Sequence, residues 1–466
     1  MTMAQHREQM KKSYYDPDDV QDVSRTTRNH VPDTAPGAER RVHCGKAVPM
    51  KLKVLLCAIA ITAAVSSLSA QTTPIVVKAG TLIDGKGGTQ SNVAIVIQDS
   101  KIVRIEPARA GATFDLSTQT VMPGFIDTHA HLFDHFDRTS GRLRTAAIPE
   151  TPAQTMLYMV ENAYRTLQAG FTTVQSPGNE LDKDLRDWIN DGRVPGPRVL
   201  TSLRQIFDNT GSPEEIRVFV RKAVADGADF IKIFATGSIR DGGRQTMTDA
   251  QIQAACGEAN ARGKRTLAHA QGPEGAKAAV LAGCTTIEHG NRLTDEVIRL
   301  MVEHGTYFDS NNHLMIYNYL ENKPRFLGIG NYTEEGFAYM ERGLAPGNDS
   351  FKRALAAKVK MVFGTDATAG AHGRNAEELI YRVREGGQAP MDAIVTATSR
   401  SAESMRLGDQ IGTIAPGMQA DIIATDGNPL KDITAVRRIT FVMKGGNVFK
   451  NEVPASSQPG ATRRTN

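Results

Sequence analysis

The stretch "GFIDTHAHLFDHF" at residues 124–136 carries two histidines, His129 and His131, directly after a Pro-Gly turn and a short apolar run. On an extended chain, a spacing of two residues points both imidazoles to the same side. Two neutral imidazoles on one side are a natural half of a metal site. An isolated pair is equally compatible with two ordinary polar residues in a loop. Residues elsewhere in the chain are needed to distinguish these two interpretations.

The composition is that of an ordinary soluble globular protein, with 40% hydrophobic and 23% charged residues among 466. This length allows one large core and a smaller additional domain. Aromatic residues make up only 6%, which argues against a surface for stacking nucleic-acid bases. Without residues 1–70, basic and acidic side chains are almost equal in number, so we expect no nucleic-acid partner.

The first 70 residues differ from the rest of the chain. Residues 1–49 are polar, interrupted by prolines and without periodicity, and we interpret them as a non-native or disordered leader. Residues 50–70 have a basic start, an apolar run too short to span a bilayer comfortably, and small residues at the end, as in a secretory signal peptide. A buried helix is the alternative. We expect translation from Met50, cleavage after Ala70, and a periplasmic or secreted protein without membrane association.

Both ends of the remaining chain read as a small β domain. Residues 71–120 and 409–453 contain short β-rich runs broken by Gly, Asp and Ser, which predict one β-sandwich-like domain built from both segments. Residues 454–466 are predicted to be a disordered tail. Of the four cysteines only Cys256 and Cys284 follow residue 70, and the sequence suggests no disulfide framework.

The middle of the chain, residues 121–408, alternates between strand-like and helical patterns. Helical stretches such as the one from Ser212 to Gly227 have a capping residue at the start and a glycine at the end. Eight strand–helix units predict an α/β fold, a (β/α)8 TIM barrel. The strand-like runs lie near Phe125 and at residues 172–176, 198–202, 229–235, 265–270, 285–290, 306–310 and 360–366.

Metal-ligating residue types recur at the carboxyl ends of the predicted strands, where the catalytic groups of such barrels lie. Each residue taken alone is more often a polar side chain that finishes a strand, but the set as a whole predicts a site. Its members are His129, His131, His269, His289 and Asp366.

Lys232 is the most unusual residue of the predicted strands. In "DFIKIFATG" it shares one face with Phe230 and Phe234, so its amine is expected to be buried. A buried, unpaired ammonium is costly, and burial makes the amine nucleophilic. Reaction with CO2 would give a carbamate that can bridge two metal ions. The alternatives are a lysine paired with a carboxylate, or a Schiff-base lysine, which would leave the histidines unexplained.

The motifs "PGFIDTHAHL", "FIKIFATG", "LAHAQG", "TIEHG" and "FGTDA", followed by "GTIAPGMQADIIATDGNPL", resemble those of the amidohydrolase superfamily. More narrowly, the chain is similar to the imidazolonepropionase-related, metal-dependent prolidase-like group of Xaa-Pro dipeptidase type. The loop "GSIRDGGRQ" departs from the Gly-Gly-Val form found in many of its members, which leaves the substrate open.

The resemblance implies two divalent metal ions, with zinc expected, and a carbamate on Lys232 that bridges them together with a hydroxide. His129, His131 and Asp366 would bind one ion, and His269 and His289 the other. Asp366 would also be the catalytic residue that moves the proton. A homo-oligomer is expected, and family members include octamers.

The expected activity is hydrolysis of amide bonds in dipeptides or N-acyl amino acids. Three alternatives stay open: an ochratoxin-like aryl-amide hydrolase with the same site, a mononuclear imidazolonepropionase- or deaminase-type enzyme, and an inactive scaffold of the same fold. Six residues on predicted mouth loops are candidates for holding the substrate, although each is also compatible with an ordinary loop residue. They are His135, Arg240, Arg244, Tyr307, His313 and His372.

Overall fold

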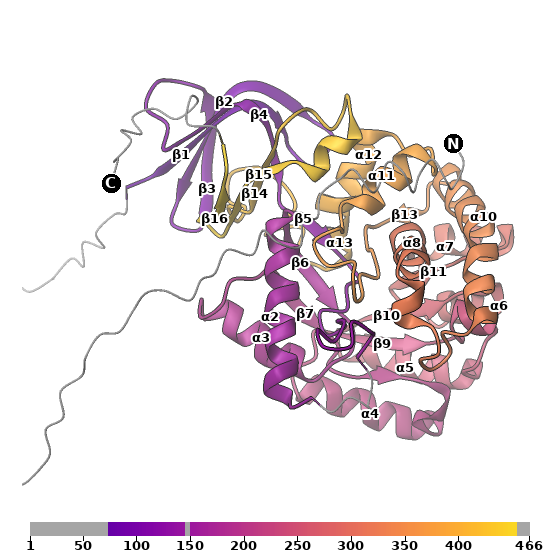
Figure 1. Ribbon diagram of the computed structural model, residues 1–466. Coiled ribbons are helices and arrows are strands. Elements are labelled where there is room, and N and C mark those ends of the chain that lie inside the picture. Colours follow the sequence, from indigo (N-terminus) through magenta and orange to yellow (C-terminus); the bar gives the residue numbers. More distant parts are fainter. Residues whose placement is uncertain (1–72, 145–149, 454–466) are drawn as a thin grey trace, which may run out of the picture. The chain divides into compact units, whose positions relative to one another are not determined.

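The structure, a computed structural model, describes residues 73–144 and 150–453 (Figure 1). The predicted leader, signal peptide and tail, at residues 1–49, 50–70 and 454–466, lie outside these ranges. Within them, no helix combines the length and the apolar character that crossing a membrane requires.

Strands from both ends of the chain hydrogen-bond into one seven-stranded sheet, in the order β16-β15-β14-β4-β1-β2-β3 (Figure 1). Neighbours are antiparallel except β1 and β4. The sequence predicted a sandwich-like arrangement here, whereas the described strands form a single sheet. The strands are β1 (Ile75–Ile83), β2 (Thr89–Gln98), β3 (Lys101–Pro107), β4 (Phe114–Pro123), β14 (Ile422–Thr425), β15 (Ile439–Lys444) and β16 (Asn447–Asn451).

The middle of the described chain carries short parallel strands in two sheets, ordered β5-β6-β7 and β8-β9-β10-β11-β12-β13. Parallel strands bring their carboxyl ends to the same edge, which is where the candidate residues were predicted. The strands are β5 (Phe125–Asp127), β6 (Phe171–Ser176), β7 (Arg198–Thr201), β8 (Gln205–Ile206), β9 (Phe230–Phe234), β10 (Arg265–Ala270), β11 (Thr286–His289), β12 (Tyr307–Asp309) and β13 (Lys360–Met361).

The third predicted strand, residues 198–202, is β7, and a short strand that was not predicted, β8, follows it in the other parallel sheet. Leu203 has a φ of 58°, and this left-handed residue separates β7, which pairs with β6, from β8, which pairs with β9. The eighth predicted strand is regular only in β13. Beyond it, the chain bonds to the segment after β5: the N–H of Thr128 donates to the Phe363 carbonyl over 2.8 Å, and the N–H of His131 donates to the Ala367 carbonyl over 2.8 Å.

Helices follow most of the parallel strands. The predicted cap Ser212 is confirmed, because its side chain accepts a hydrogen bond from the third residue of α4. Thr248 caps α5 in the same way. The helices are α2 (Pro152–Gln168), α3 (Leu181–Asn190), α4 (Pro213–Ala225), α5 (Asp249–Ala261), α6 (Pro273–Leu281), α7 (Asp295–His304), α8 (His313–Glu321), α9 (Lys323–Phe326), α10 (Glu334–Ala356), α11 (Glu377–Arg384), α12 (Pro390–Val395) and α13 (Ser401–Ser404). In addition there are 3-10 turns at η1 (Asp208–Thr210), η2 (Ile239–Asp241) and η4 (Ile433–Arg437) and a π-helical turn at η3 (Thr396–Arg400).

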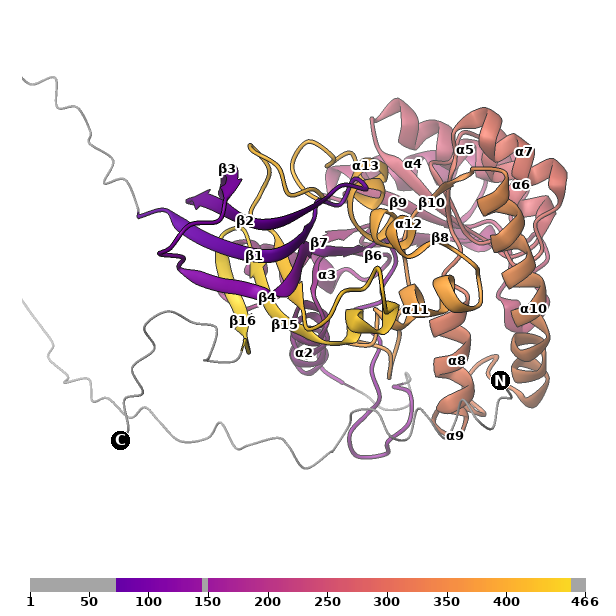
Figure 2. The same cartoon turned by 90° about the horizontal axis from the view of Figure 1, so that it is seen from above.

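An apolar core joins the seven-stranded sheet to the parallel strands. Met122 and Ile423 of the sheet pack in one buried cluster with Phe125, Phe171 and Phe363. Figure 2 shows the two sets of strands beside each other. Burial of this apolar surface holds the first parallel strand in place, and with it the segment that carries His129 and His131.

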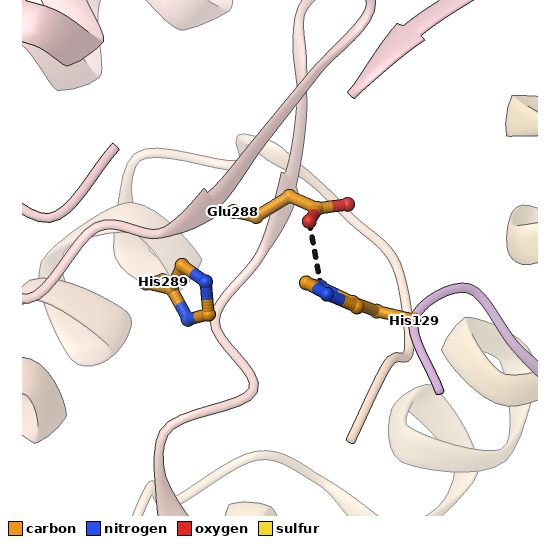
Figure 3. Close-up of side chains that lie close together, drawn as sticks. All are labelled: His129, Glu288 and His289. Carbon is orange, nitrogen blue, oxygen red and sulfur yellow. Dashed lines mark ion pairs between the residues drawn. The ribbon is translucent and has the colours of Figure 1, made fainter. Parts of the chain in front are cut away.

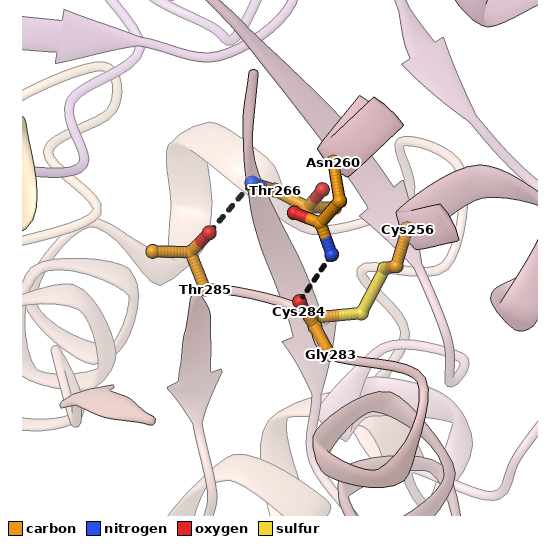
Figure 4. Close-up of a disulfide and its surroundings, with 6 residues drawn as sticks. All are labelled: Cys256, Asn260, Thr266, Gly283, Cys284 and Thr285. Atoms are coloured by element: carbon orange, nitrogen blue, oxygen red, sulfur yellow. Dashed lines mark hydrogen bonds between the residues drawn. A yellow bond between two sulfur atoms is a disulfide. The ribbon is translucent and has the colours of Figure 1, made fainter. Parts of the chain in front are cut away.

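The expectation of no disulfide framework is wrong. Cys256 of α5 is bonded to Cys284, which lies two residues before β11 (Figure 4). Their Cα atoms are 5.3 Å apart although the residues are 28 positions apart in sequence. This pairing depends on how α5 packs beside the turn that leads into β11. The periodicity of either segment alone therefore cannot predict that the two cysteines meet.

Candidate active site

Five of the six predicted metal ligands lie near or beyond the carboxyl ends of the parallel strands, and the sixth, Lys232, lies in the middle of a strand. Five of them line a cavity of about 340 Å³, namely His129, His131, His269, His289 and Asp366. Lys232, in the middle of β9, is fully buried beside it, and its Nζ lies 3.5 Å from Nε2 of His129. The structure therefore brings together residues that are up to 237 positions apart in sequence (129 to 366).

The two histidines of the opening motif face one carboxylate. Their Nε2 atoms are 3.2 Å apart, and Oδ1 of Asp366 lies 3.4 Å from Nε2 of His129 and 3.1 Å from Nε2 of His131. These three ligand atoms all lie within 4.8 Å of one another, a spacing that can hold a metal ion.

The other two histidines form a second group. The rings of His269 and His289 lie 4.3 Å apart, and the His269 ring stacks on Phe234 with 4.6 Å between centroids. The His289 ring lies 5.6 Å from that of His129, so the two groups adjoin. His289 and Asp366 both adopt a left-handed backbone, with φ of 71° and 50°. Non-glycine residues in this conformation cluster at functional sites.

A carboxylate that the sequence analysis missed lies beneath the site. Glu288, the residue before His289, is fully buried, and its Oε2 lies 2.6 Å from Nδ1 of His129 (Figure 3). The same oxygen contacts Nζ of Lys232. The competing interpretation of Lys232, a lysine paired with a carboxylate, is thus realised in the structure. The signal was present in "TIEHG", because a carboxylate in a buried strand has to find a partner inside.

Burial and charge set the protonation of these groups. Burial lowers the pKa of His289 to about 3, and burial together with the neighbouring His289 and Lys232 lowers that of His269. Burial opposes ionisation of Glu288, but His129 and Lys232 outweigh it and lower its pKa to about 2. The pKa of Asp366 likewise lies well below its usual range, because the nearby His129 and His131 outweigh burial. Neutral imidazoles and ionised carboxylates are the forms that bind metal ions.

Of the six predicted substrate contacts, only Arg240 lines the cavity. Tyr307 is the first residue of β12, so it lies at the opposite end of the strand, where its hydroxyl donates to Glu403. His135 is buried against Glu150, and Arg244 is exposed. His313 and His372 are both buried, beside Glu378 and the Asp134 carbonyl respectively. Loop position alone does not specify which way a side chain points.

Arg240 is the cation of this cavity. Its guanidinium lies 4.1 Å from the centre of the Tyr332 ring and 5.4 Å from that of Tyr319, and its Nε donates to Asn331 over 2.8 Å. Among the described residues no carboxylate lies within ion-pair distance of it. The cavity also contains residues that the sequence did not single out: Phe133, Asp134, Ser176, Gly178, Asn179, Asp182, Gln205, Phe234, Ser238, Ile239, Gln271, Met315, Tyr319 and Tyr332.

The chain belongs to the amidohydrolase family, whose model matches residues 120–449. Ochratoxinase from Aspergillus niger is 28% identical over 430 residues, covering 80% of this chain and 86% of that protein. Imidazolonepropionase from Salinispora arenicola is 24% identical over 381 residues, covering 74% and 88%. A solved Xaa-Pro dipeptidase with methionine bound in its active site is 31% identical with a TM-score of 0.74, covering 81% of this chain and 100% of that one.

These findings define the class of enzyme. The chain is a hydrolase that acts on amide bonds, with an α/β fold whose neighbours are of the TIM-barrel type. The family generally uses divalent metal ions, and the groups His129–His131–Asp366 and His129–Glu288–His289 have the spacing to hold them.

Proposed function

We propose that the protein is a binuclear metal-dependent amidohydrolase that cleaves dipeptides or N-acyl amino acids. The observation that carries the proposal is the approach of the His129 and His131 rings and the Asp366 carboxylate to within 3.4 Å of one another, beside a second histidine pair. Nitrogen and oxygen ligands of this kind suit zinc.

The donor set fits metal ions. Nδ1 of His289 is buried without a hydrogen-bond partner among the described residues. A polar atom left without a partner in a protein interior is costly, so this nitrogen favours a bound metal ion. His129, His131 and Asp366 would hold one ion and His269 and His289 the other.

When bound, divalent ions lower the pKa of a water molecule and polarise the scissile carbonyl. The remaining steps belong to the protein. The carboxylate of Asp366 accepts the proton of the attacking water and delivers it to the nitrogen of the leaving amine. The low pKa of Asp366 keeps this carboxylate ionised before the reaction, because the nearby histidines outweigh burial. His269 stays fixed by the Phe234 ring and by the Gly237 carbonyl, 3.3 Å from its Nε2.

Lys232 distinguishes two versions of the site. In the binuclear version the side-chain nitrogen of Lys232 would add to CO2 with loss of one proton, and the resulting carbamate would supply anionic oxygens for the metal ions. The Lys232–Glu288 contact favours the second candidate, a mononuclear enzyme of imidazolonepropionase or deaminase type, in which the lysine stays an ammonium. Counting metal ions per subunit, together with a 13C signal after exposure to 13CO2, separates the two. Two ions and a carbamate support the binuclear enzyme, whereas one ion and no carbamate support the mononuclear one.

Arg240 supports a substrate with a free carboxylate. A guanidinium in a cavity without a carboxylate partner suits an anionic group of the substrate. The aromatic walls Phe133, Phe234 and Tyr319 suit an apolar side chain. The related Xaa-Pro dipeptidase and ochratoxinase are both compatible with this chemistry, so dipeptides and ochratoxin-like N-acyl amino acids are the substrates to compare.

The proposal also includes the organisation of the chain. The parallel strands are taken as one (β/α)8 barrel within residues 121–408, with β7 and β8 as halves of the third strand. Residues 71–120 and 409–453 are taken as a separate small domain. Export through residues 50–70, cleavage after Ala70 and a homo-oligomeric state belong to the same proposal. Amino-terminal sequencing of the natural protein tests the export, since a mature chain that retains Ile59–Val65 would exclude it.

The decisive experiment is a screen of the zinc-loaded protein against dipeptides and N-acyl amino acids, with metal content measured in parallel. Hydrolysis that requires the metal supports the proposal. If the protein binds no divalent ion after careful loading and hydrolyses none of these substrates, it is an inactive scaffold of the same fold.

A further inference from the structure

Glu288 links two candidate metal ligands through one carboxylate oxygen. It is fully buried in β11, and its Oε2 lies 2.6 Å from Nδ1 of His129 (Figure 3). The same Oε2 contacts Nζ of Lys232. The two partners come from the segment after β5 and from the centre of β9. One side chain therefore couples residues that are 103 positions apart in sequence.

The contact to His129 determines which nitrogen of the ring can bind a metal ion. The carboxylate of Glu288 is a charged acceptor at Nδ1 and favours a proton there. The amide nitrogen of Asn311 lies 3.1 Å from the same Nδ1, but it is a neutral donor and could bond only to the tautomer without that proton. Nε2 then keeps its lone pair, and this is the atom that faces His131 and Asp366. Carboxylates that accept from the outer nitrogen of a ligating histidine fix both its tautomer and its orientation.

The contact between Glu288 and Lys232 orients the side chain of Lys232, the second candidate ligand. An amine and a carbamate both carry an N–H, so the same oxygen can accept from this nitrogen before and after CO2 has added. The negative charge of Glu288 also lies in a fully buried place beside the proposed cations, where opposite charge is strongly favourable. No other carboxylate among the described residues pairs with Lys232.

We propose that Glu288 is a positioning residue for the metal centre, which orients His129 and Lys232 toward the ions without binding an ion itself. This inference rests on the proposed binuclear function. It competes with two other roles. Glu288 could itself be a ligand, since it lies with His129 and His289 in a group that can hold an ion. It could also serve only to neutralise Lys232 in a mononuclear enzyme.

The test compares Glu288→Gln and Glu288→Asp with the wild-type holoenzyme. Gln keeps the size of the side chain and removes its charge, whereas Asp keeps the charge and shortens the reach. Glu378→Gln is the matched control, because Glu378 is equally buried but pairs with Arg382 and His313 rather than with the proposed ligands. The readouts are zinc affinity by competition with a chelator, zinc content at saturation, the 13C carbamate signal, and the absorption spectrum of the Co2+-loaded protein.

We expect Glu288→Gln to bind zinc about 10- to 100-fold more weakly, as other outer partners of metal ligands do, while two ions still bind at saturation. Its carbamate signal should fall and its Co2+ spectrum should change. The zinc affinity and carbamate signal of Glu288→Asp should lie between those of Glu288→Gln and of the wild type. If Glu288→Gln does not fold, the comparison of Glu288→Asp with the wild type tests the inference. The control variant Glu378→Gln should bind zinc with an affinity within about twofold of the wild type.

Three results would overturn the inference. Loss of one whole ion at saturation in both variants would make Glu288 a ligand. An unchanged zinc affinity and carbamate signal in Glu288→Gln would leave it no role beyond charge balance. A wild-type protein that binds fewer than two ions or shows no carbamate rejects the binuclear function itself, and the inference falls with it. The first two results leave the proposed function standing, so the two failures are distinguishable.

Discussion

The backbone N–H of Asp366 donates a hydrogen bond to the carbonyl oxygen of His129 over 2.7 Å, while the side chains of the same two residues approach to 3.4 Å. The first contact holds the segment after β13 against the segment after β5 whatever side chain stands at position 366. A substitution at position 366 can therefore remove the negative charge while the backbone hydrogen bond keeps the residue in place.

Replacement of Asp366 by Asn should separate metal binding from proton transfer. Asn keeps a carbonyl oxygen for the metal but cannot accept a proton. We expect about two ions per subunit and a kcat lower by about 10²- to 10⁴-fold, the usual contribution of general acid–base catalysis. Metal analysis and steady-state kinetics check this. A variant that keeps both ions and turns over within about threefold of the wild type would mean that another group moves the proton.

Replacement of Lys232 by Ala should remove the bridge between the ions. The variant lacks the nitrogen of the proposed carbamate, so we expect loss of metal and of activity. Short carboxylic acids added to the assay should partly restore both, because a carboxylate can occupy the place of the carbamate. Lys360→Ala, a change at a half-exposed lysine paired with Glu403, is the control and should have no effect. Two bound ions and full turnover in Lys232→Ala would exclude the bridge.

Arg240 should recognise the carboxylate of the substrate. For the wild type, converting that carboxylate to an amide should lower kcat/KM by about 10-fold or more, which corresponds to about 1.4 kcal/mol. Arg240→Met should lose this preference and act on the acid and the amide at similar rates. The matched control is Arg244→Met, since Arg244 is exposed and lies outside the cavity lining. Equal rates of the wild-type enzyme on acid and amide would reject the assignment.

The disulfide between Cys256 and Cys284 should stabilise the fold without taking part in catalysis. Closing a loop over a sequence separation of 28 residues is worth about 3.5 kcal/mol in the loop-entropy description. We expect a reductant to lower the Tm of the wild type and to leave the Tm of the Cys256→Ala/Cys284→Ala variant unchanged. Below the melting range, kcat should be the same in both. An identical Tm of the wild type with and without reductant would contradict the prediction.

Lys444 should give the stability a pH dependence above neutrality. Burial lowers the pKa of Lys444 from 10.5 to about 8, against the opposing charge of Asp421. Burying the ammonium therefore lowers the free energy of unfolding. This cost is complete below pH 8, where the amine is charged in both states, and it is gone above about pH 10.5, where the amine is neutral in both. The wild type should gain stability relative to Lys444→Met across this range, measured by thermal unfolding at stepwise pH. A difference in Tm that stays constant would show that this amine is not disfavoured by burial.

The gathering of the candidate metal ligands was predictable because it depends on local sequence and on one rule of topology. His129, His131, His269, His289 and Asp366 lie near the end of a strand or after it, each strand is revealed by its own apolar run, and parallel strands bring their carboxyl ends together. Lys232 was predictable for a related reason, since strand alternation between Phe230 and Phe234 buries its amine. Neither inference needed the packing of the helices.

The tertiary structure alone decided which side chains meet across the fold. Glu288 reaches His129 and Lys232, Cys256 reaches Cys284, and Leu203 turns the chain between the two parallel sheets. Five of the six predicted substrate contacts lie outside the cavity lining, whereas Tyr319 and Tyr332 line it. Strand periodicity fixes the face and the end at which a residue lies. The directions of loop side chains, and contacts between distant segments, follow only from the packing of the whole chain.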